Sequence, residues 1–329
     1  MAEFIIGQSV RKLARRHPLL QRVLWRLDLA LVWTLVSLFR LLPVDVASNL
    51  GSRVGRLVGP RMQRKQALFE ENFSKAFPDF PQQQRLQLID DAWGQVGRVL
   101  AEYPHLGAIL KDDRRLEVVQ QEPLDLVNDG ARPRVYVTAH VGNWELVCTG
   151  LAKLGISNTS LYSPPTNPHL DRMLAKQRKA LNCELIPREN CTRPLMRTIS
   201  EGGSIGLVID RRVDEGKPID FFGEDKTTSI LAAKLALKYG IDLVPVRVER
   251  KQGAAFKVTY FRPIQPANPD APAADQACDM IQQLHSQFEE WIRSNPADWF
   301  CSKRLWFKVK RNPIGKKTPT HPGINSHAA

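Results

Sequence analysis

The sequence predicts an α/β protein built on a mixed or largely parallel sheet. From residue 134 onward, short apolar runs alternate with segments of helical periodicity, and this alternation is typical of strands joined by helices. The run "SIGLVID" (204–210) is apolar almost throughout, as a buried strand would be. The chain has 329 residues, of which 43% are hydrophobic, enough for a sizeable core.

Each element of that prediction rests on a local pattern. An amphipathic helix is expected at 82–106, before the sheet region. Pro168 marks the first turn of one later helix, and Gly240 ends another. The expected strands are 134–138, 158–163, 183–187, 204–210, 242–250 and 255–261. One helix is expected directly after His140. Further helices are expected at 168–182, 192–203, 229–240 and 275–296.

The chain divides into three parts. Residues 1–45 form a basic region that includes the apolar segment "LDLALVWTLVSLFRLLP" (27–43). Its uncharged core, Leu29–Phe39, is far shorter than the roughly 20 residues that span a bilayer. Residues 46–307 form the main domain, and 308–329 is a polar, basic tail expected to be disordered.

Basic residues flank this apolar segment on both sides, so the positive-inside rule gives it no orientation. We therefore expect a membrane-associated helix at the cytoplasmic face that lies in the interface or enters the leaflet shallowly. If the segment is extended to Leu27–Leu42, Asp28 and Arg40 must snorkel near its ends. The alternative is a buried core helix. The flanking basic residues are Arg11, Lys12, Arg15, Arg16, Arg22 and Arg26 before it, and Arg53, Arg56, Arg61, Arg64 and Lys65 after it.

The formal net charge is +13, which favours an anionic partner: nucleic acid, acidic lipid or an acidic carrier protein. None of the aromatic signatures of RNA-binding modules is present, so nucleic acid is not expected. The five cysteines form no CxxC pair, which argues against a disulfide framework or a structural zinc site and favours a reducing compartment.

The stretch "VTAHVGNWELVCTGL" (137–151) carries the candidate chemistry. His140 follows a strand, where a side chain projects from the carboxyl edge of a sheet. Gly142 and Asn143 permit a tight turn, and Glu145 is expected to face back toward the imidazole. A carboxylate on one ring nitrogen raises the basicity of histidine and leaves the other nitrogen to take a proton from a hydroxyl. The alternative is a loop histidine near a solvated glutamate.

The stretch "AHVGNWE" resembles the HX4(D/E) motif of glycerolipid-type acyltransferases, and more narrowly that of the bacterial lipid A late acyltransferases. The resemblance covers roughly residues 20–307. Further pieces follow in the family's order: "YSPPTNPHLD", "QRKALNCELIPREN", the block from "GLVIDRRVDEG" through "DFFGEDKTTS", and "WIRSNPADWFCSKRLW". The chain departs from the family at Ser163, at Arg211–Arg212 and at Lys303, where arginine, an acidic residue and histidine respectively are usual.

The resemblance implies a glycerolipid-acyltransferase-like sheet and transfer of a lauroyl- or myristoyl-class chain to a hydroxyl of a Kdo-lipid A precursor. The donor would be an acyl thioester on acyl carrier protein, or acyl-CoA, with no metal or other cofactor. It implies work at the cytoplasmic face of the inner membrane, on an anionic lipid acceptor. His140 would be the general base and Glu145 its orienting carboxylate, with Asp210 a second partner of the pair or a ligand of nearby arginines.

By the same resemblance, Arg178 and Arg188 are phosphate-binding candidates, and Asn143 and Asn167 are substrate-binding candidates. Asn143 has a competing interpretation as a left-handed turn residue.

The Trp299, Phe300 and Trp306 rings suit either a membrane interface or the core. The acyl chain is expected between the helix at Leu146–Leu154 and Trp144, with Leu231, Leu235 and Leu237 on its wall. The acceptor alternatives are a lysophospholipid or a mannosylated inositol lipid. The alternative of a different class is a basic membrane-binding protein without activity.

Overall fold

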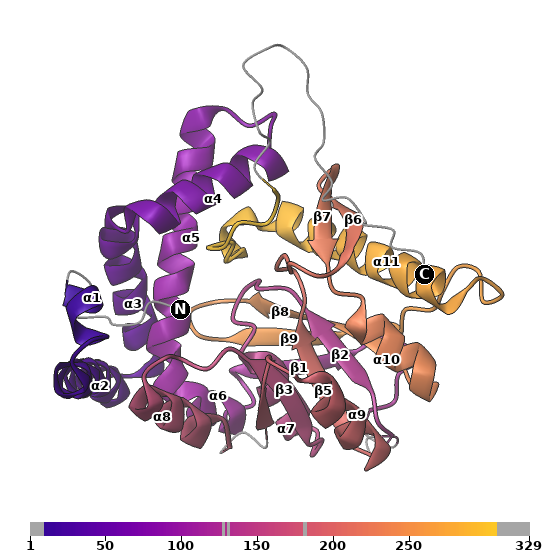
Figure 1. The fold of residues 1–329 in the computed structure, drawn as a ribbon, viewed down its shortest axis with the longest axis horizontal. Coiled ribbons are helices and arrows are strands. Elements are labelled where there is room, and N and C mark those ends of the chain that lie inside the picture. The colour runs from indigo at the N-terminus through magenta and orange to yellow at the C-terminus, as the bar shows by residue number, and fades with distance from the viewer. Residues whose placement is uncertain (1–9, 127–128, 130–131, 180–182, 308–329) are drawn as a thin grey trace.

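A mixed sheet forms the centre of the molecule. The computed structural model describes residues 10–126, 129, 132–179 and 183–307 (Figure 1). Within them, the sheet has seven strands in the order β1-β9-β8-β2-β5-β3-β4. Their bounds are β1 Leu116–Gln120, β2 Val135–Thr138, β3 Asn158–Tyr162, β4 Cys183–Pro187, β5 Ser204–Val208, β8 Leu243–Arg250 and β9 Phe256–Tyr260.

Five neighbouring strands of this sheet run in one direction. The pairs β8-β2, β2-β5, β5-β3 and β3-β4 are parallel, so the carboxyl ends of these strands meet at one edge. Strand β9 is antiparallel to β8, and β1 is parallel to β9. The predicted α/β class and mixed sheet are thereby confirmed. Strand β1 and the two-stranded hairpin β6 (Lys217–Phe221)–β7 (Glu224–Thr228) are additions that the sequence patterns had not indicated.

Helices cover both faces of the sheet. Helix α7 (Leu146–Lys153) packs with α6 (Leu106–Lys111) in one buried cluster, which contains Leu146, Val147 and Leu151. The larger cluster lies on the other face and contains the buried side of α9 (Thr192–Ser200), α10 (Leu231–Tyr239) and α11 (Ala273–Ser294). Helix α8 (Pro168–Lys179) connects the last two strands of the parallel edge, β3 and β4.

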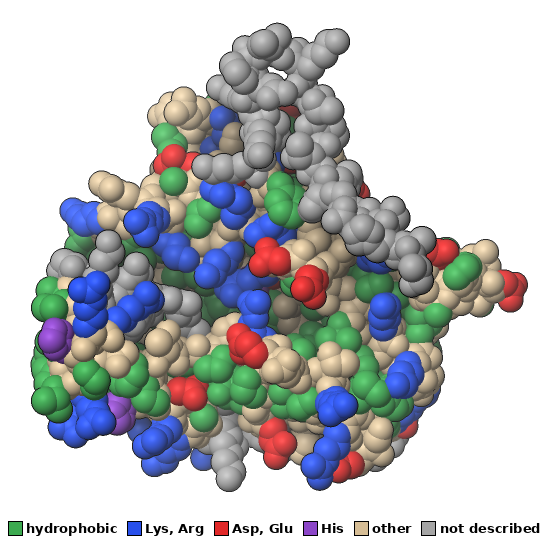
Figure 2. Space-filling model, viewed as in Figure 1, with side chains coloured by type: hydrophobic (Ala, Val, Ile, Leu, Met, Phe, Trp, Pro, Cys, Tyr) green, Lys and Arg blue, Asp and Glu red, His purple; other side chains and the backbone are tan. Residues whose placement is uncertain are grey.

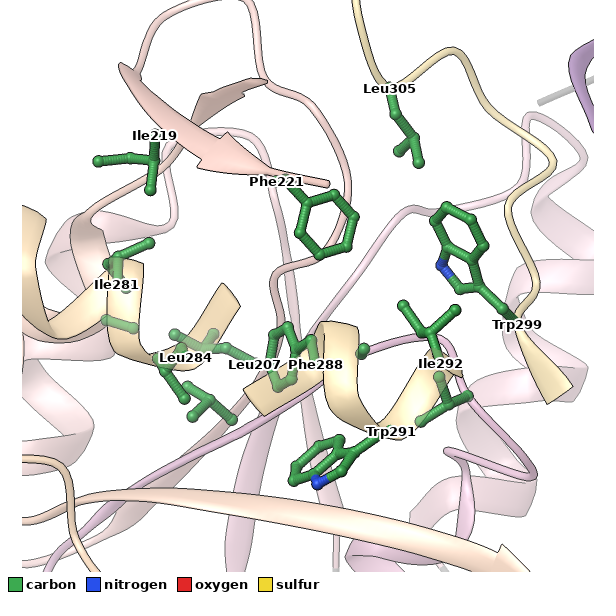
Figure 3. Packing of buried hydrophobic residues seen from close by; sticks show 14 of the residues in the cluster. Leu207, Ile219, Phe221, Ile281, Leu284, Phe288, Trp291, Ile292, Trp299 and Leu305 are labelled. Carbon is green, nitrogen blue, oxygen red and sulfur yellow. The ribbon is translucent and has the colours of Figure 1, made fainter. Parts of the chain in front are cut away.

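The larger cluster also fixes the hairpin and the segment after α11. Figure 3 shows the hairpin side chains above the buried side of α11, with the side chains of the final segment beside them. The labelled residues are Leu207, Ile219, Phe221, Ile281, Leu284, Phe288, Trp291, Ile292, Trp299 and Leu305. Trp299 and Trp306 are almost completely buried, so these two rings belong to the core. Phe300 is partly buried against the same cluster.

An N-terminal layer of helices stands beside the sheet (Figure 1). It contains α1 Arg11–Ala14, α2 Pro18–Leu41, α3 Val44–Val58, α4 Gln63–Ala76 and α5 Gln82–Glu102. Helices α3 and α5 cross closely because glycines face each other. A Cβ on Gly97 would lie 2.0 Å from the carbonyl oxygen of Gly51, so neither helix tolerates a side chain there without moving.

Helix α2 contains the predicted apolar segment and begins earlier than expected. Its exposed apolar residues recur mostly every four positions, which places them in one stripe along the helix. That stripe consists of Leu19, Val23, Leu27, Leu31, Leu35 and Leu38. Asp28 is buried, so the expectation that it snorkels to a membrane surface is wrong. Within the described residues, no helix is both long enough and apolar enough to cross a bilayer.

Candidate active site

His140 and Asp210 lie together at the carboxyl edge of the sheet. Thr138 is the register partner of Val208 in the parallel pair β2-β5, and each candidate follows its strand by two residues. Because parallel neighbours end at the same edge, equal offsets bring the two side chains side by side. His140 Nδ1 is 2.5 Å from Asp210 Oδ1, and both side chains are buried.

The surroundings of Asp210 keep its carboxylate ionised. Burial opposes ionisation, but the positive charges of His140, Lys226 and Arg211 and the hydrogen bond from His140 outweigh it, so the pKa of Asp210 lies well below its usual range. Trp299 Nε1 also points at Asp210 Oδ2 from 3.4 Å. A permanent carboxylate at Nδ1 fixes the imidazole tautomer with the proton on Nδ1, which leaves Nε2 as the basic nitrogen. Among the described residues, Nε2 has no hydrogen-bond partner.

Lys226 contacts the backbone of Asp210, and the sequence patterns had not indicated that Lys226 belongs to the site. The hairpin strand β7 places its ammonium group inside the protein, where Nζ donates to the carbonyl oxygen of Asp210 at 2.8 Å. Burial lowers the pKa of Lys226 to about 7, and the charges of Asp210 and Glu289 oppose that effect. Lysine is rarely buried, so a buried lysine next to a catalytic candidate points to a role in the site. The alternation of residues along a hairpin strand does not show which lysine will be buried, so the sequence could not identify it.

The turn after His140 depends on Gly142. Its φ is +56°, and a Cβ there would lie 2.3 Å from the carbonyl oxygen of Val248 on β8. Only glycine therefore fits this left-handed position against the neighbouring strand. The turn is also held from the C-terminal side, because the Gly142 amide donates to the carbonyl of Asp298 at 3.0 Å and the Phe300 amide donates to that of His140 at 2.8 Å.

Asn143 anchors the turn to α5. It is fully buried, and its Nδ2 donates to Glu102 Oε2 at 2.9 Å. The Glu102 carboxylate also accepts from Ser48 and pairs with Arg250 at 2.6 Å and 3.0 Å. The left-handed interpretation of Asn143 is wrong, because Gly142 takes that conformation instead. That Asn143 binds substrate stays a prediction. This buried network joins the helical layer to the site.

Glu145 does not occupy the predicted place on the imidazole, because Asp210 holds Nδ1. The prediction assumed that the helix begins directly after His140, which would bring Glu145 back over the ring after about one turn. Instead the chain forms a turn after His140, and Glu145 is the N-cap residue of α7, which begins at Leu146. The HX4E spacing is present, but the carboxylate that contacts Nδ1 comes from 70 residues further along the chain.

Aromatic rings surround the histidine. The rings of Trp144 and Phe300 stack with centroids 5.5 Å apart and planes within 4°. The His140 ring meets the Trp144 ring edge-on, with centroids 5.1 Å apart. These rings limit water around the imidazole and give the site an apolar wall.

The remaining predicted residues have different outcomes. Asn167 is buried, donates to the carbonyl of Trp25 on α2 at 2.8 Å and accepts from the His169 amide at 3.0 Å. It joins α8 to α2 through these contacts, and its role in substrate binding stays a prediction. Arg188 is exposed next to β4, with Nε 3.8 Å from a carboxylate oxygen of Glu189. The Arg178 side chain lies outside the described part of the chain.

The expected acyl channel does not form as one wall. Leu146 and Leu151 of α7 belong to the buried cluster on one face of the sheet. Leu231, Leu235 and Leu237 of α10 belong to the cluster on the other face. The sheet separates the two sets, so they cannot line one channel, and the prediction that they do is wrong.

Comparison with known proteins places the chain in a family. The family model described as "Bacterial lipid A biosynthesis acyltransferase" matches residues 17–308. A lipid A biosynthesis acyltransferase of Haemophilus influenzae is 23% identical over 62% of this chain and 65% of its own length. A phosphatidylinositol mannoside acyltransferase of Mycobacterium tuberculosis is 27% identical over 52% of this chain and 54% of its own length.

A third relative is matched over much more of its length. The lipid A biosynthesis lauroyltransferase of Escherichia coli is 25% identical over 88% of this chain and 92% of its own length. The chain thus spans less than two thirds of the first two relatives and nearly all of the third. Since the family model matches most of the sequence, this chain belongs to the bacterial lipid A biosynthesis acyltransferase family.

Proposed function

We propose that the protein transfers an acyl chain from a thioester to a hydroxyl of a lipid A precursor. The observation that carries the proposal is the contact of His140 Nδ1 with the buried carboxylate of Asp210, which leaves Nε2 basic at the edge of the sheet. Family membership supports the reaction class. The donor is acyl carrier protein or CoA carrying a lauroyl- or myristoyl-class chain, and the net charge of +13 suits an acidic carrier and an anionic lipid.

In the proposed reaction, His140 Nε2 takes the proton of the acceptor hydroxyl as its oxygen attacks the thioester carbonyl. The tetrahedral intermediate collapses to the ester and releases the thiolate, which takes the proton from Nε2. Asp210 remains ionised throughout and stabilises the imidazolium that forms between these steps. Glu145 lies three residues beyond Gly142, and its proposed role is to position the chain between His140 and α7.

The acceptor has a second candidate. The Mycobacterium relative is named for a phosphatidylinositol mannoside, and it is matched over about half of this chain. An assay of the purified protein with lauroyl and myristoyl donors, offered a Kdo-lipid A precursor or a mannosylated inositol lipid, separates the two. We expect transfer to the lipid A precursor, detected as a mass gain of one acyl chain. Transfer to the inositol lipid alone would overturn the acceptor assignment, and transfer to neither would overturn the function.

We also propose that α2 and α3 rest on the cytoplasmic face of the inner membrane. The supporting observation is exposed apolar surface on both helices, continued on α3 by Val46, Leu50, Val54 and Leu57. Residues of this kind at one helix face suit the boundary between headgroups and acyl chains, and the arginines nearby suit anionic lipid. Flotation of the protein with vesicles of phosphatidylethanolamine and phosphatidylglycerol tests this, and a failure to float would contradict it.

A further inference from the structure

Several cations come together beside the His140–Asp210 pair. Lys65 comes from α4, Arg211 directly follows Asp210, and Lys303 lies in the segment after α11. These are three segments far apart in the sequence. Figure 2 shows Lys and Arg side chains gathered in the middle of one face of the molecule.

Hydrogen bonds and chain connectivity hold all three segments at the site. Lys65 Nζ donates to the carbonyl of Ser302 at 3.1 Å, which places it next to Lys303. Asn72 of the same helix donates to the carbonyls of Cys301 and Lys303 at 2.6 Å and 2.8 Å. The same final segment reaches the catalytic candidate, since the Phe300 amide donates to the carbonyl of His140. The cations are therefore fixed by the framework of the active site.

In the described part of the chain, these cations have no close counter-ion. Within the described residues, no carboxylate lies within 4 Å of the charged groups of Lys65, Arg211 or Lys303. Burial, followed by the charges of Lys303 and Arg211, lowers the pKa of Lys65. Burial also lowers the pKa of Arg211, with Asp210 opposing and Arg188 adding to the effect. The one carboxylate nearby, Asp210, is already engaged by His140.

Lys65 and Arg211 are partly buried, whereas Lys303 is exposed. Partly buried charges of one sign without counter-ions cost free energy, and an anion with several oxygens relieves that cost. Arginine and lysine together suit a phosphate, which accepts charge-assisted hydrogen bonds from several directions.

We propose that Lys65, Arg211 and Lys303 form a phosphate-binding subsite that holds a substrate phosphate next to His140. The identity of the substrate in this proposal rests on the proposed acyl-transfer function. The binding of a phosphate by these residues does not. The phosphate belongs either to the lipid acceptor or to the phosphopantetheine arm of the thioester donor. In either case, binding of the phosphate would hold the reacting atom of that substrate at a fixed distance from His140, and this orients the substrate for reaction.

Binding without turnover tests the subsite independently of the reaction. Inorganic pyrophosphate is titrated into the full-length protein in detergent, and the melting temperature is followed. We expect stabilisation of the wild type that is lost in Lys65→Gln and in the Arg211→Gln/Lys303→Gln double variant. Lys234→Gln is the matched control, because it removes one exposed charge on α10, away from the site. Equal stabilisation in all four proteins, or none in the wild type, would overturn the subsite.

Kinetics then identify the source of the phosphate. Loss of one charged donor to a phosphate is expected to raise the relevant KM about 10-fold or more. A rise in the KM for the acceptor, absent when the acceptor's phosphates are removed, assigns the subsite to the acceptor. A rise in the KM for the thioester donor assigns it to the donor. Both KM values within twofold of wild type would overturn the proposal, whereas an inactive wild type that still binds pyrophosphate would overturn only the proposed function.

Discussion

The carboxyl edge of the sheet buries charged side chains, whereas the outer side of α2 and α3 exposes apolar ones. At the sheet edge, charged groups are buried: Asp210 and Lys226 have almost no exposed surface. On α2 and α3, apolar side chains such as Leu27 and Leu50 are exposed. Each arrangement costs stability in a soluble monomer, so each is best explained by what the region does. The comparison separates the region that we propose carries out the chemistry from the one that we propose contacts lipid.

The two regions are joined by one buried network. Glu102 at the end of α5 contacts Ser48 of α3, Asn143 of the catalytic turn and Arg250 of β8. A change at this junction should therefore affect both regions, whereas changes at the sheet edge or on α2 should each affect one. The predictions below use that difference, in order of decreasing effect.

The largest expected effect is on turnover at the sheet edge. His140→Ala removes the proposed base and Asp210→Asn removes the charge that orients it, so each should lower kcat about 10²- to 10⁴-fold. Vesicle binding should stay at the wild-type level, because α2 and α3 are untouched. Steady-state kinetics and flotation measure the two properties. If Glu145→Gln lowers kcat more than Asp210→Asn does, the orienting carboxylate is wrongly assigned.

The next effect is on stability at the junction. Glu102→Leu leaves Arg250 buried without its partner, and breaking such a buried pair typically costs about 3–5 kcal/mol of unfolding free energy. Glu71→Leu is the matched control, since the Glu71–Arg304 pair is partly exposed and should be worth about 1 kcal/mol or less. Denaturant unfolding compares them. Equal losses would show that the network does not hold the two regions together.

A smaller effect is expected in the catalytic turn itself. Gly142→Ala places a Cβ against the Val248 carbonyl in a left-handed conformation, which should cost about 1–3 kcal/mol and reduce kcat by displacing His140. Gly107→Ala, on α6, meets no atom within 4 Å and should be neutral or slightly stabilising. Thermal unfolding and kcat for both variants check this. A fully active Gly142→Ala protein would mean that the turn has another conformation.

The smallest effect is expected on the outer side of α2. Leu38→Ser removes one exposed apolar side chain and should weaken binding to vesicles about tenfold, with kcat on a detergent-dispersed acceptor unchanged. Thr34→Ser, an exposed position on the same helix, is the control and should bind like the wild type. Vesicle titration gives both affinities. Identical affinity for Leu38→Ser would place the membrane contact elsewhere.

Much of the fold could be predicted from the sequence, because local apolar runs between helical patterns indicate strands such as 183–187 and 204–208. The hairpin was missed because its residues, such as "EDKTT" at 224–228, are mostly polar. Strand β1 was missed because it pairs with β9, which lies far along the chain. Local periodicity contains no information on such pairing.

The site shows the same limit at the level of single residues. His140 and the Gly142 turn were recognisable from adjacent residues. The partner of His140 was not, because the choice between Glu145 and Asp210 depends on the β2-β5 register, which local spacing does not contain. Asn143 and Asn167 looked like substrate ligands in sequence, but tertiary contacts with Glu102 and Trp25 use their amides within the fold.

A double-mutant cycle tests the central claim most directly: that His140 and Asp210 act as one unit. The kcat of wild type, His140→Ala, Asp210→Asn and the double variant is measured with a single donor and acceptor. Because Asp210 acts only through the imidazole, the double variant should lose no more activity than His140→Ala alone. If the two losses multiply, so that the double variant falls far below either single variant, Asp210 contributes independently of His140 and the proposed mechanism is wrong.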